Sequence, residues 1–118
     1  MCRGPQIAYA EGTEFRIAGG GTNIWADGVD GSTIIETKFV GSAQSPYIPG
    51  SGVPDFIQAK IDAQQASEMS RYAAIINDGS TGYTDLRVVT NSNAAVPYFD
   101  NLMSEYGVPG EVVVRPAP

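Results

Sequence analysis

The sequence WADGVDGSTIIETKFV, residues 25–40, determines which fold the chain is expected to adopt. Its second half, residues 33–40, consists mostly of β-branched, aromatic and other residues that favour a strand. Isoleucines precede Glu36 and apolar residues follow Lys38, so this strand is expected to be central and largely buried. The two Asp-Gly pairs before it are typical of hairpin turns and indicate that another strand precedes it.

Segments on both sides of this strand show strand and helix patterns. Alternating apolar residues predict two short strands before it, at residues 13–18 and 23–27. After it, apolar residues at helical spacing, beginning with Phe56 and Ile57, predict a helix over residues 55–76. A strand, a helix and a final strand are predicted at residues 85–90, 94–106 and 111–115. The order β-β-β-α-β-α-β predicts an α+β fold, close to α/β, with a mixed central sheet and helices packed on it.

Composition restricts the size of the molecule and its chemistry. The chain has 118 residues, a length that allows one domain. It has no histidine and one cysteine, which excludes a histidine general base, a disulfide framework and a multi-cysteine zinc site. The net charge of −6 argues against binding of nucleic acid through a broad basic surface. No apolar segment approaches the roughly 18 residues that span a bilayer.

Two carboxylates and a lysine are expected to converge beside the predicted hairpin. Residues two apart in a strand point to the same side, so Glu36 and Lys38 share one face. The preceding turn brings either Asp27 or Asp30 beside them. Oxygen ligands that share a site with water suit Mg²⁺ or Mn²⁺, and Lys38 could orient the attacking water or stabilise charge on phosphorus. The alternative is a solvated Glu–Lys pair beside an ordinary Asp-Gly turn.

These residues resemble a known family. An Asp-Gly pair followed by two apolar residues, an acid, any residue and a lysine is similar to the PD-(D/E)xK nuclease core. More closely, WADGVDGSTIIETKFV, SRYAAIIND and DLRVVTNSNAAVPYFDNLMSEYGVPGEVVVRP resemble the restriction-endonuclease-fold toxin domains at the C-termini of bacterial polymorphic toxins. The resemblance covers about residues 13–116.

The resemblance implies a restriction-endonuclease-like core and a metal-dependent nuclease toxin, with DNA favoured over RNA as the substrate. It implies that residues 1–118 are one nuclease-like domain, the C-terminal domain of a longer secreted protein. Such a toxin acts in the cytoplasm of competitor cells, does not insert into membranes and is neutralised by a cognate immunity protein. Mapped onto the family pattern, Asp27 and Glu36 are catalytic acids that bind the metal, and Lys38 is the catalytic lysine.

Asp30 is the rival of Asp27 as a metal ligand. Nine positions separate Asp27 from Glu36 and six separate Asp30 from it, and the longer spacing leaves room for a turn between strands. The spacing therefore favours Asp27. Domains of this family usually begin with a helix that can donate a glutamate. Only about twelve residues precede the first predicted strand here, with Glu11 and Glu14 as candidates.

One polar face of the long helix is expected to bind substrate. Its residues lie three or four positions apart: Gln64 (or Gln65), Glu68 and Arg71. In this interpretation Arg71 contacts a phosphate, and the alternative is an ordinary solvated face with a Glu–Arg pair. Tyr72 is expected to pack in the core rather than to act in chemistry. Trp25 is also expected in the core, and the alternative is that it stacks on a base.

The loop at residues 41–52 is long and rich in glycine, serine and proline. Because it leaves the strand soon after Lys38, it is expected to border the site as a mobile flap with Tyr47 and Ile48 exposed at its tip. A plain surface connection is the alternative.

Two other functions remain open at this point. One is a catalytically inactive binding module with the same fold, which divalent-metal binding through Glu36 would distinguish from a nuclease. The other is an unrelated α+β domain in which the Glu-x-Lys sequence is accidental.

Overall fold

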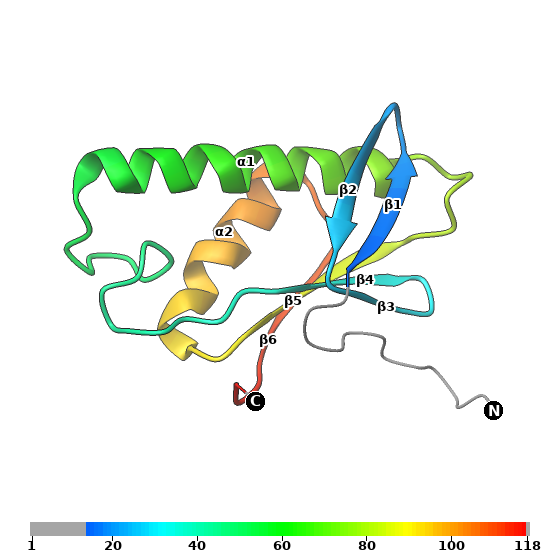
Figure 1. Ribbon diagram of the computed structural model, residues 1–118. Helices are drawn as coiled ribbons and strands as arrows, with labels where there is room; N and C mark the ends of the chain where they lie inside the picture. The colour runs from blue at the N-terminus through cyan, green and yellow to red at the C-terminus, as the bar shows by residue number, and fades with distance from the viewer. Residues whose placement is uncertain (1–13, 118) are drawn as a thin grey trace.

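The computed structural model describes residues 14–117 and shows an α+β fold (Figure 1). Its elements are β1 (Phe15–Gly19), β2 (Thr22–Ala26), β3 (Gly28–Asp30), β4 (Thr33–Thr37), α1 (Asp55–Asn77), β5 (Asp85–Thr90), a short 3₁₀ helix (Asn93–Ala95), α2 (Val96–Tyr106) and β6 (Gly110–Val114). Within this range, no helix has the length and apolar character needed to cross a membrane.

The larger sheet has the strand order β3-β4-β5-β6. β3 is antiparallel to β4, whereas β4, β5 and β6 are parallel. α1 connects β4 to β5, and α2 connects β5 to β6. Both connections proceed in the same direction across the sheet, and such crossovers are almost always right-handed. The two helices therefore lie on the same face of the sheet (Figure 1).

α1 turns one side toward the sheet and α2. Its buried residues lie three or four positions apart, which is the spacing of one helix face: Gln65, Met69, Tyr72 and Ile75. The apolar ones pack in one core with Ile34 of β4, Leu86 of β5 and Phe99 of α2. Full burial of a large apolar side chain contributes about 1.5–3 kcal/mol, so this packing fixes α1 over β4.

β1 and β2 form a separate hairpin beside the C-terminal half of α1 (Figure 1). Ile17 and Ile24 lie opposite each other in the register and join the core. Gly20 in the turn has a φ of 57°, and a Cβ there would overlap the carbonyl oxygen of Ala74. Its N–H donates to Asp78 Oδ2 at 2.9 Å. This close approach holds the hairpin against the end of α1.

The predicted fold class is confirmed, with one additional strand. β3 occupies residues that were expected to form a turn, and the turn itself is at Gly31, where φ is 63°. The order is therefore β-β-β-β-α-β-α-β, because Asp30 pairs with Thr33 and only Gly31 and Ser32 form the turn between β3 and β4.

The apolar stripe predicted for the start of the long helix is wrong. Phe56 and Ile57 are 77% and 39% exposed. The N-terminal turn of α1 extends past the four-stranded sheet, so these side chains have no core beneath them (Figure 1).

The expected exposure of Tyr47 and Ile48 in the loop at residues 41–52 is also wrong. Both side chains are partly buried against the core. The ring centroid of Tyr47 lies 5.0 Å from that of Phe99 and 5.6 Å from that of Tyr98. Aromatic side chains of α2 thus give the loop an apolar surface to pack on. Tyr47 and Ile48 are partly buried because they pack on this surface.

Candidate active site

The C-terminal end of β4 directs two charged side chains toward α1. Glu36 is 7% exposed, and the side chain of Lys38 is 13% exposed. They lie on the same face as Ile34, which belongs to the core, so the acid and the lysine extend a buried stripe. The Lys38 N–H donates to the carbonyl oxygen of Val89 at 2.8 Å, which keeps the lysine in line with the strand.

Lys38 lies between carboxylates from two elements. Its Nζ is 3.0 Å from Glu36 Oε2 on β4 and 2.9 Å from Glu68 Oε1 on α1. Glu68, which the sequence predicts to bind substrate, contacts the lysine in this structure. The ammonium thereby connects the strand to the helix, and the pair of carboxylates fixes its position.

Tyr72 holds the other oxygen of Glu36. The phenol is completely buried and donates a hydrogen bond to Glu36 Oε1 at 2.8 Å. Burial and then the Glu36 carboxylate raise the pKa of Tyr72 above its usual value, so the phenol keeps the proton that it donates. Both oxygens of Glu36 thus have partners, and the side chain has one defined orientation.

Asp27 lies next to Glu36, whereas Asp30 does not. The backbone of Asp27 donates to the carbonyl oxygen of Ile35 at 3.1 Å, and its Oδ2 accepts from the Thr37 N–H at 2.7 Å. The nine residues from Asp27 to Glu36 include β3 and the turn after it, so the chain reverses and brings Glu36 back beside Asp27. Asp30 pairs with Thr33 at the turn end of this hairpin, away from Glu36.

Asp30 has a different partner, Arg87 of β5. Its Oδ2 is 3.2 Å from Arg87 Nη1, and Arg87 Nε is 3.4 Å from Glu111 Oε2. The carboxylates of Asp30 and Glu111 thus neutralise the Arg87 guanidinium, and Arg87 does not line the pocket that contains Glu36.

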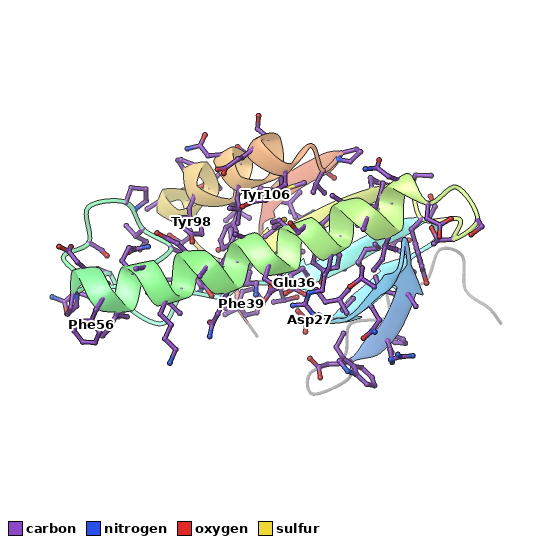
Figure 2. All side chains as sticks on the ribbon, turned by 90° about the horizontal axis from the view of Figure 1, so that it is seen from above. Asp27, Glu36, Phe39, Phe56, Tyr98 and Tyr106 are labelled. Carbon is purple, nitrogen blue, oxygen red and sulfur yellow. The ribbon has the colours of Figure 1, made fainter. Side chains whose placement is uncertain are left out.

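One pocket of about 390 Å³ brings the three predicted catalytic residues together. Figure 2 shows Asp27 and Glu36 side by side along the middle of α1, far from Phe56. The pocket is lined by Glu14, Ile24, Trp25, Asp27, Glu36, Thr37, Lys38, Glu68 and Arg71. Four of these side chains are acidic and two are basic, so the pocket carries excess negative charge.

The predicted substrate-binding face of α1 is only partly in this pocket. Glu68 and Arg71 line it, whereas Gln64 lies in an adjoining groove of about 640 Å³ along the same helix. Gln65, the alternative to Gln64, is 2% exposed and faces the core. Among the glutamates expected from the N-terminal region, Glu14 lines the pocket and Glu11 lies outside the described residues.

Two residues of the site, Tyr72 and Trp25, were expected mainly as core residues. Tyr72 is buried as expected, but its hydroxyl contacts Glu36. Its position four residues after Glu68 is the sequence signal that places both on one side of the helix. Trp25 was expected in the core and is 55% exposed, because its neighbours Ile24 and Ala26 take the inward positions of β2.

The pKa of Glu36 and the pKa of Lys38 are both raised, for different reasons. Burial raises the pKa of Glu36 from its usual 4.5 to about 7, and Lys38 opposes this shift only in part. Burial lowers the pKa of Lys38, but the carboxylates of Glu36 and Glu68 outweigh it and raise the pKa above its usual value. The lysine therefore stays charged while Glu36 titrates near neutral pH.

This shift predicts that the metal-free protein loses stability as the pH rises from 4.5 to about 7. In that range folded Glu36 holds a proton that the unfolded chain releases, so folding is favoured at the acidic end. The loss amounts to about 3 kcal/mol or less. Urea unfolding in chelator, compared with Glu36→Gln at each pH, measures it. A stability difference between the two proteins that does not change with pH would contradict the expected shift.

The donor set of the pocket fits a hard divalent cation. Asp27 and Glu36 present carboxylate oxygens to a pocket with excess negative charge, and such ligands suit Mg²⁺, which keeps several waters. No group of three or more histidine, cysteine, aspartate or glutamate side chains within residues 14–117 is arranged to hold a metal ion. A metal here would therefore have these two protein ligands and complete its coordination with water.

Comparison with known proteins agrees with this geometry. A family model described as restriction endonuclease fold toxin 2 matches residues 4–109. Comparisons with curated proteins and with solved structures found no match. The matched residues include every side chain that lines the pocket.

Proposed function

The chain belongs to the restriction endonuclease fold toxin 2 family, and on that premise we propose that it hydrolyses phosphodiester bonds of nucleic acid with the help of Mg²⁺ or Mn²⁺. The observation that carries the proposal is the pocket in which Asp27, Glu36 and Lys38 meet. Two acids and a lysine on adjoining strand ends provide both a cation site and a positive group for a phosphate.

Each residue has a role in this proposal. Asp27 and Glu36 would hold the metal, which polarises a phosphoryl oxygen and lowers the pKa of bound water. Tyr72 and the Thr37 N–H orient the two carboxylates through their hydrogen bonds of 2.8 and 2.7 Å. Lys38 is protonated between Glu36 and Glu68, so it stabilises negative charge on the phosphate and does not act as a base.

The family description supports a wider proposal about where the domain acts. As a toxin domain, it would be the C-terminal part of a longer secreted protein and would act in the cytoplasm of a competitor cell. DNA is the proposed substrate, with RNA as the alternative. A cognate immunity protein would neutralise it, and the net charge of −6 suits a partner with a basic surface.

One observation favours a second candidate, an inactive binding module with the same fold. Lys38 is already neutralised by two carboxylates, and the pocket that surrounds it is acidic. A phosphate would be repelled from such a pocket unless a bound cation changed its charge. The two candidates therefore differ in whether the pocket binds a divalent metal and cleaves.

Incubation of the purified domain with plasmid DNA, with single-stranded DNA and with total RNA separates them. We expect the plasmid to be cut in Mg²⁺ and to stay intact in chelator, because the acidic pocket needs the cation before it accepts a phosphate. Glu36→Gln under the same conditions controls for a contaminating nuclease. If the plasmid, the RNA and single-stranded DNA all stay uncut with Mg²⁺ or Mn²⁺, the domain is the inactive binding module.

A further inference from the structure

Trp25 is an exposed aromatic side chain at the edge of the candidate active site. Its side chain is 55% exposed, and it lines the same pocket as Asp27 and Lys38. Burial of a large aromatic side chain stabilises a fold, so an indole left in solvent forgoes that stabilisation. Because Ile24 and Ala26 take the inward positions of β2, the hairpin keeps this indole on its outer face.

Two arginines flank the indole. Arg16 is the direct cross-strand partner of Trp25 in the register, and it is exposed on the same outer face. Arg71 of α1 donates to the carbonyl oxygen of Asn23, two residues from Trp25, at 3.4 Å. Within residues 14–117, neither arginine forms an ion pair, whereas Lys38 and Arg87 are each held by two carboxylates.

A groove along α1 leads to this position. It has a volume of about 640 Å³ and is lined by Lys60, Ala63, Gln64, Ser67, Glu68 and Arg71. Glu68 and Arg71 also line the active-site pocket, so the two hollows adjoin. Lys60 and Arg71 give the groove a cation at each end of its helical face, which suits a phosphate backbone.

We propose that Trp25, flanked by Arg16 and Arg71, is a stacking platform for an unpaired nucleotide, so that the preferred substrate is single-stranded nucleic acid. The proposal rests on the nuclease function proposed above. In a duplex both faces of each base are covered by neighbouring bases, so an indole at the pocket edge can stack only on a base that is unpaired. The arginines contact the adjoining phosphates, and Glu14 on the same pocket wall repels them toward the groove of α1.

The intrinsic fluorescence of the protein reports on this platform directly, because the chain has one tryptophan. The purified domain is titrated with short oligo-dT, short oligo-dU, short oligo-U and a DNA hairpin duplex. Ca²⁺ replaces Mg²⁺ so that the acidic pocket still has a cation, and a gel confirms that the strands stay intact. We expect the single strands to quench the fluorescence and the duplex to have little effect. A difference between oligo-dU and oligo-U, which differ only in the sugar, identifies which sugar the site accepts. Equal quenching by duplex and single strands would overturn the proposal.

Variants then test whether the indole itself contributes affinity. Variants of Trp25 have no tryptophan, so affinity is measured by the fluorescence anisotropy of a labelled oligo-dT. We expect Trp25→Ala to weaken binding about tenfold to a hundredfold, since stacking on one base is worth that much, and Trp25→Phe to retain most of the affinity. Phe56→Ala removes a more exposed aromatic at the far end of α1 and is expected to leave binding unchanged. Arg16→Ala is expected to weaken binding and reduce its dependence on salt. Wild-type affinity in Trp25→Ala would overturn the platform.

Cleavage of the same oligonucleotides in Mg²⁺ separates this proposal from the nuclease function. A domain that cleaves while its fluorescence does not respond to the substrate has no stacking platform but is still a nuclease. A domain whose fluorescence is quenched by single strands, yet cuts nothing with Mg²⁺ or Mn²⁺, retains the platform and loses the nuclease assignment.

Discussion

Lys38→Ala and Glu36→Ala are each expected to lower the rate of phosphodiester cleavage by at least about a hundredfold. Lys38→Ala removes the ammonium that is held 3.0 and 2.9 Å from Glu36 and Glu68, and with it the charge that stabilises the transition state. Glu36→Ala removes a proposed metal ligand and also the acceptor of the Tyr72 hydrogen bond. Initial rates on a labelled oligonucleotide, measured in Mg²⁺, give the size of each loss.

Arg87→Ala provides a matched control for the lysine. Arg87 is also a cation between two carboxylates, Asp30 and Glu111, but it lies outside the pocket. Its loss removes a comparable ion-pair network and is expected to leave cleavage within a few-fold of the wild type. Circular dichroism and urea unfolding show whether each variant is folded. A folded Lys38→Ala protein that keeps most of the wild-type rate would remove Lys38 from the mechanism.

The arrangement of β4 was predictable because it depends on local geometry. The period of two in a strand puts Glu36 and Lys38 on one face, and no tertiary contact is needed to infer this. The spacing from Asp27 to Glu36 leaves room for a turn between strands, and this was enough to favour Asp27 over Asp30. The strand β3 itself was missed because three residues are too few for an alternating pattern.

The contacts of α1 could not be predicted in the same way. Helical periodicity shows that Glu68 and Tyr72 share a side of the helix, but it does not show which strand residues face them. The buried contact from Tyr72 to Glu36 depends on where the core fixes α1 over β4. Periodicity also counted Phe56 as part of the apolar stripe, although the sheet ends before that turn begins.

Trp25 illustrates a limit of short strands. β2 has the sequence TNIWA, in which Ile24, Trp25 and Ala26 are all apolar, so either set of alternate residues could face inward. Packing of the hairpin against α1 selects Ile24 and Ala26, because Gly20 allows the turn to approach the helix closely. The larger side chain is left outside, and this outcome depends on tertiary packing rather than on hydrophobicity.

Asp27→Asn is expected to be far more damaging to cleavage than Asp30→Asn, by about a hundredfold or more. Asparagine keeps the size of the side chain and can still accept the hydrogen bond that Thr37 N–H gives to Oδ2 at 2.7 Å. The substitution therefore removes mainly the negative charge that a divalent cation requires. Asp30→Asn weakens a partly exposed ion pair with Arg87, which contributes about 0–1 kcal/mol to stability and nothing to the pocket.

Calorimetric titration with Mn²⁺ links this comparison to the metal. We expect Asp27→Asn to weaken Mn²⁺ binding and Asp30→Asn to bind Mn²⁺ like the wild type. Asp27 lines the pocket together with Glu36, whereas Asp30 does not. Unfolding in urea serves as the check that both variants are folded. If Asp30→Asn lost both metal and cleavage while Asp27→Asn kept them, the metal ligand would be Asp30. The cation would then lie near the turn of the β3–β4 hairpin, where Arg87 competes for the same carboxylate.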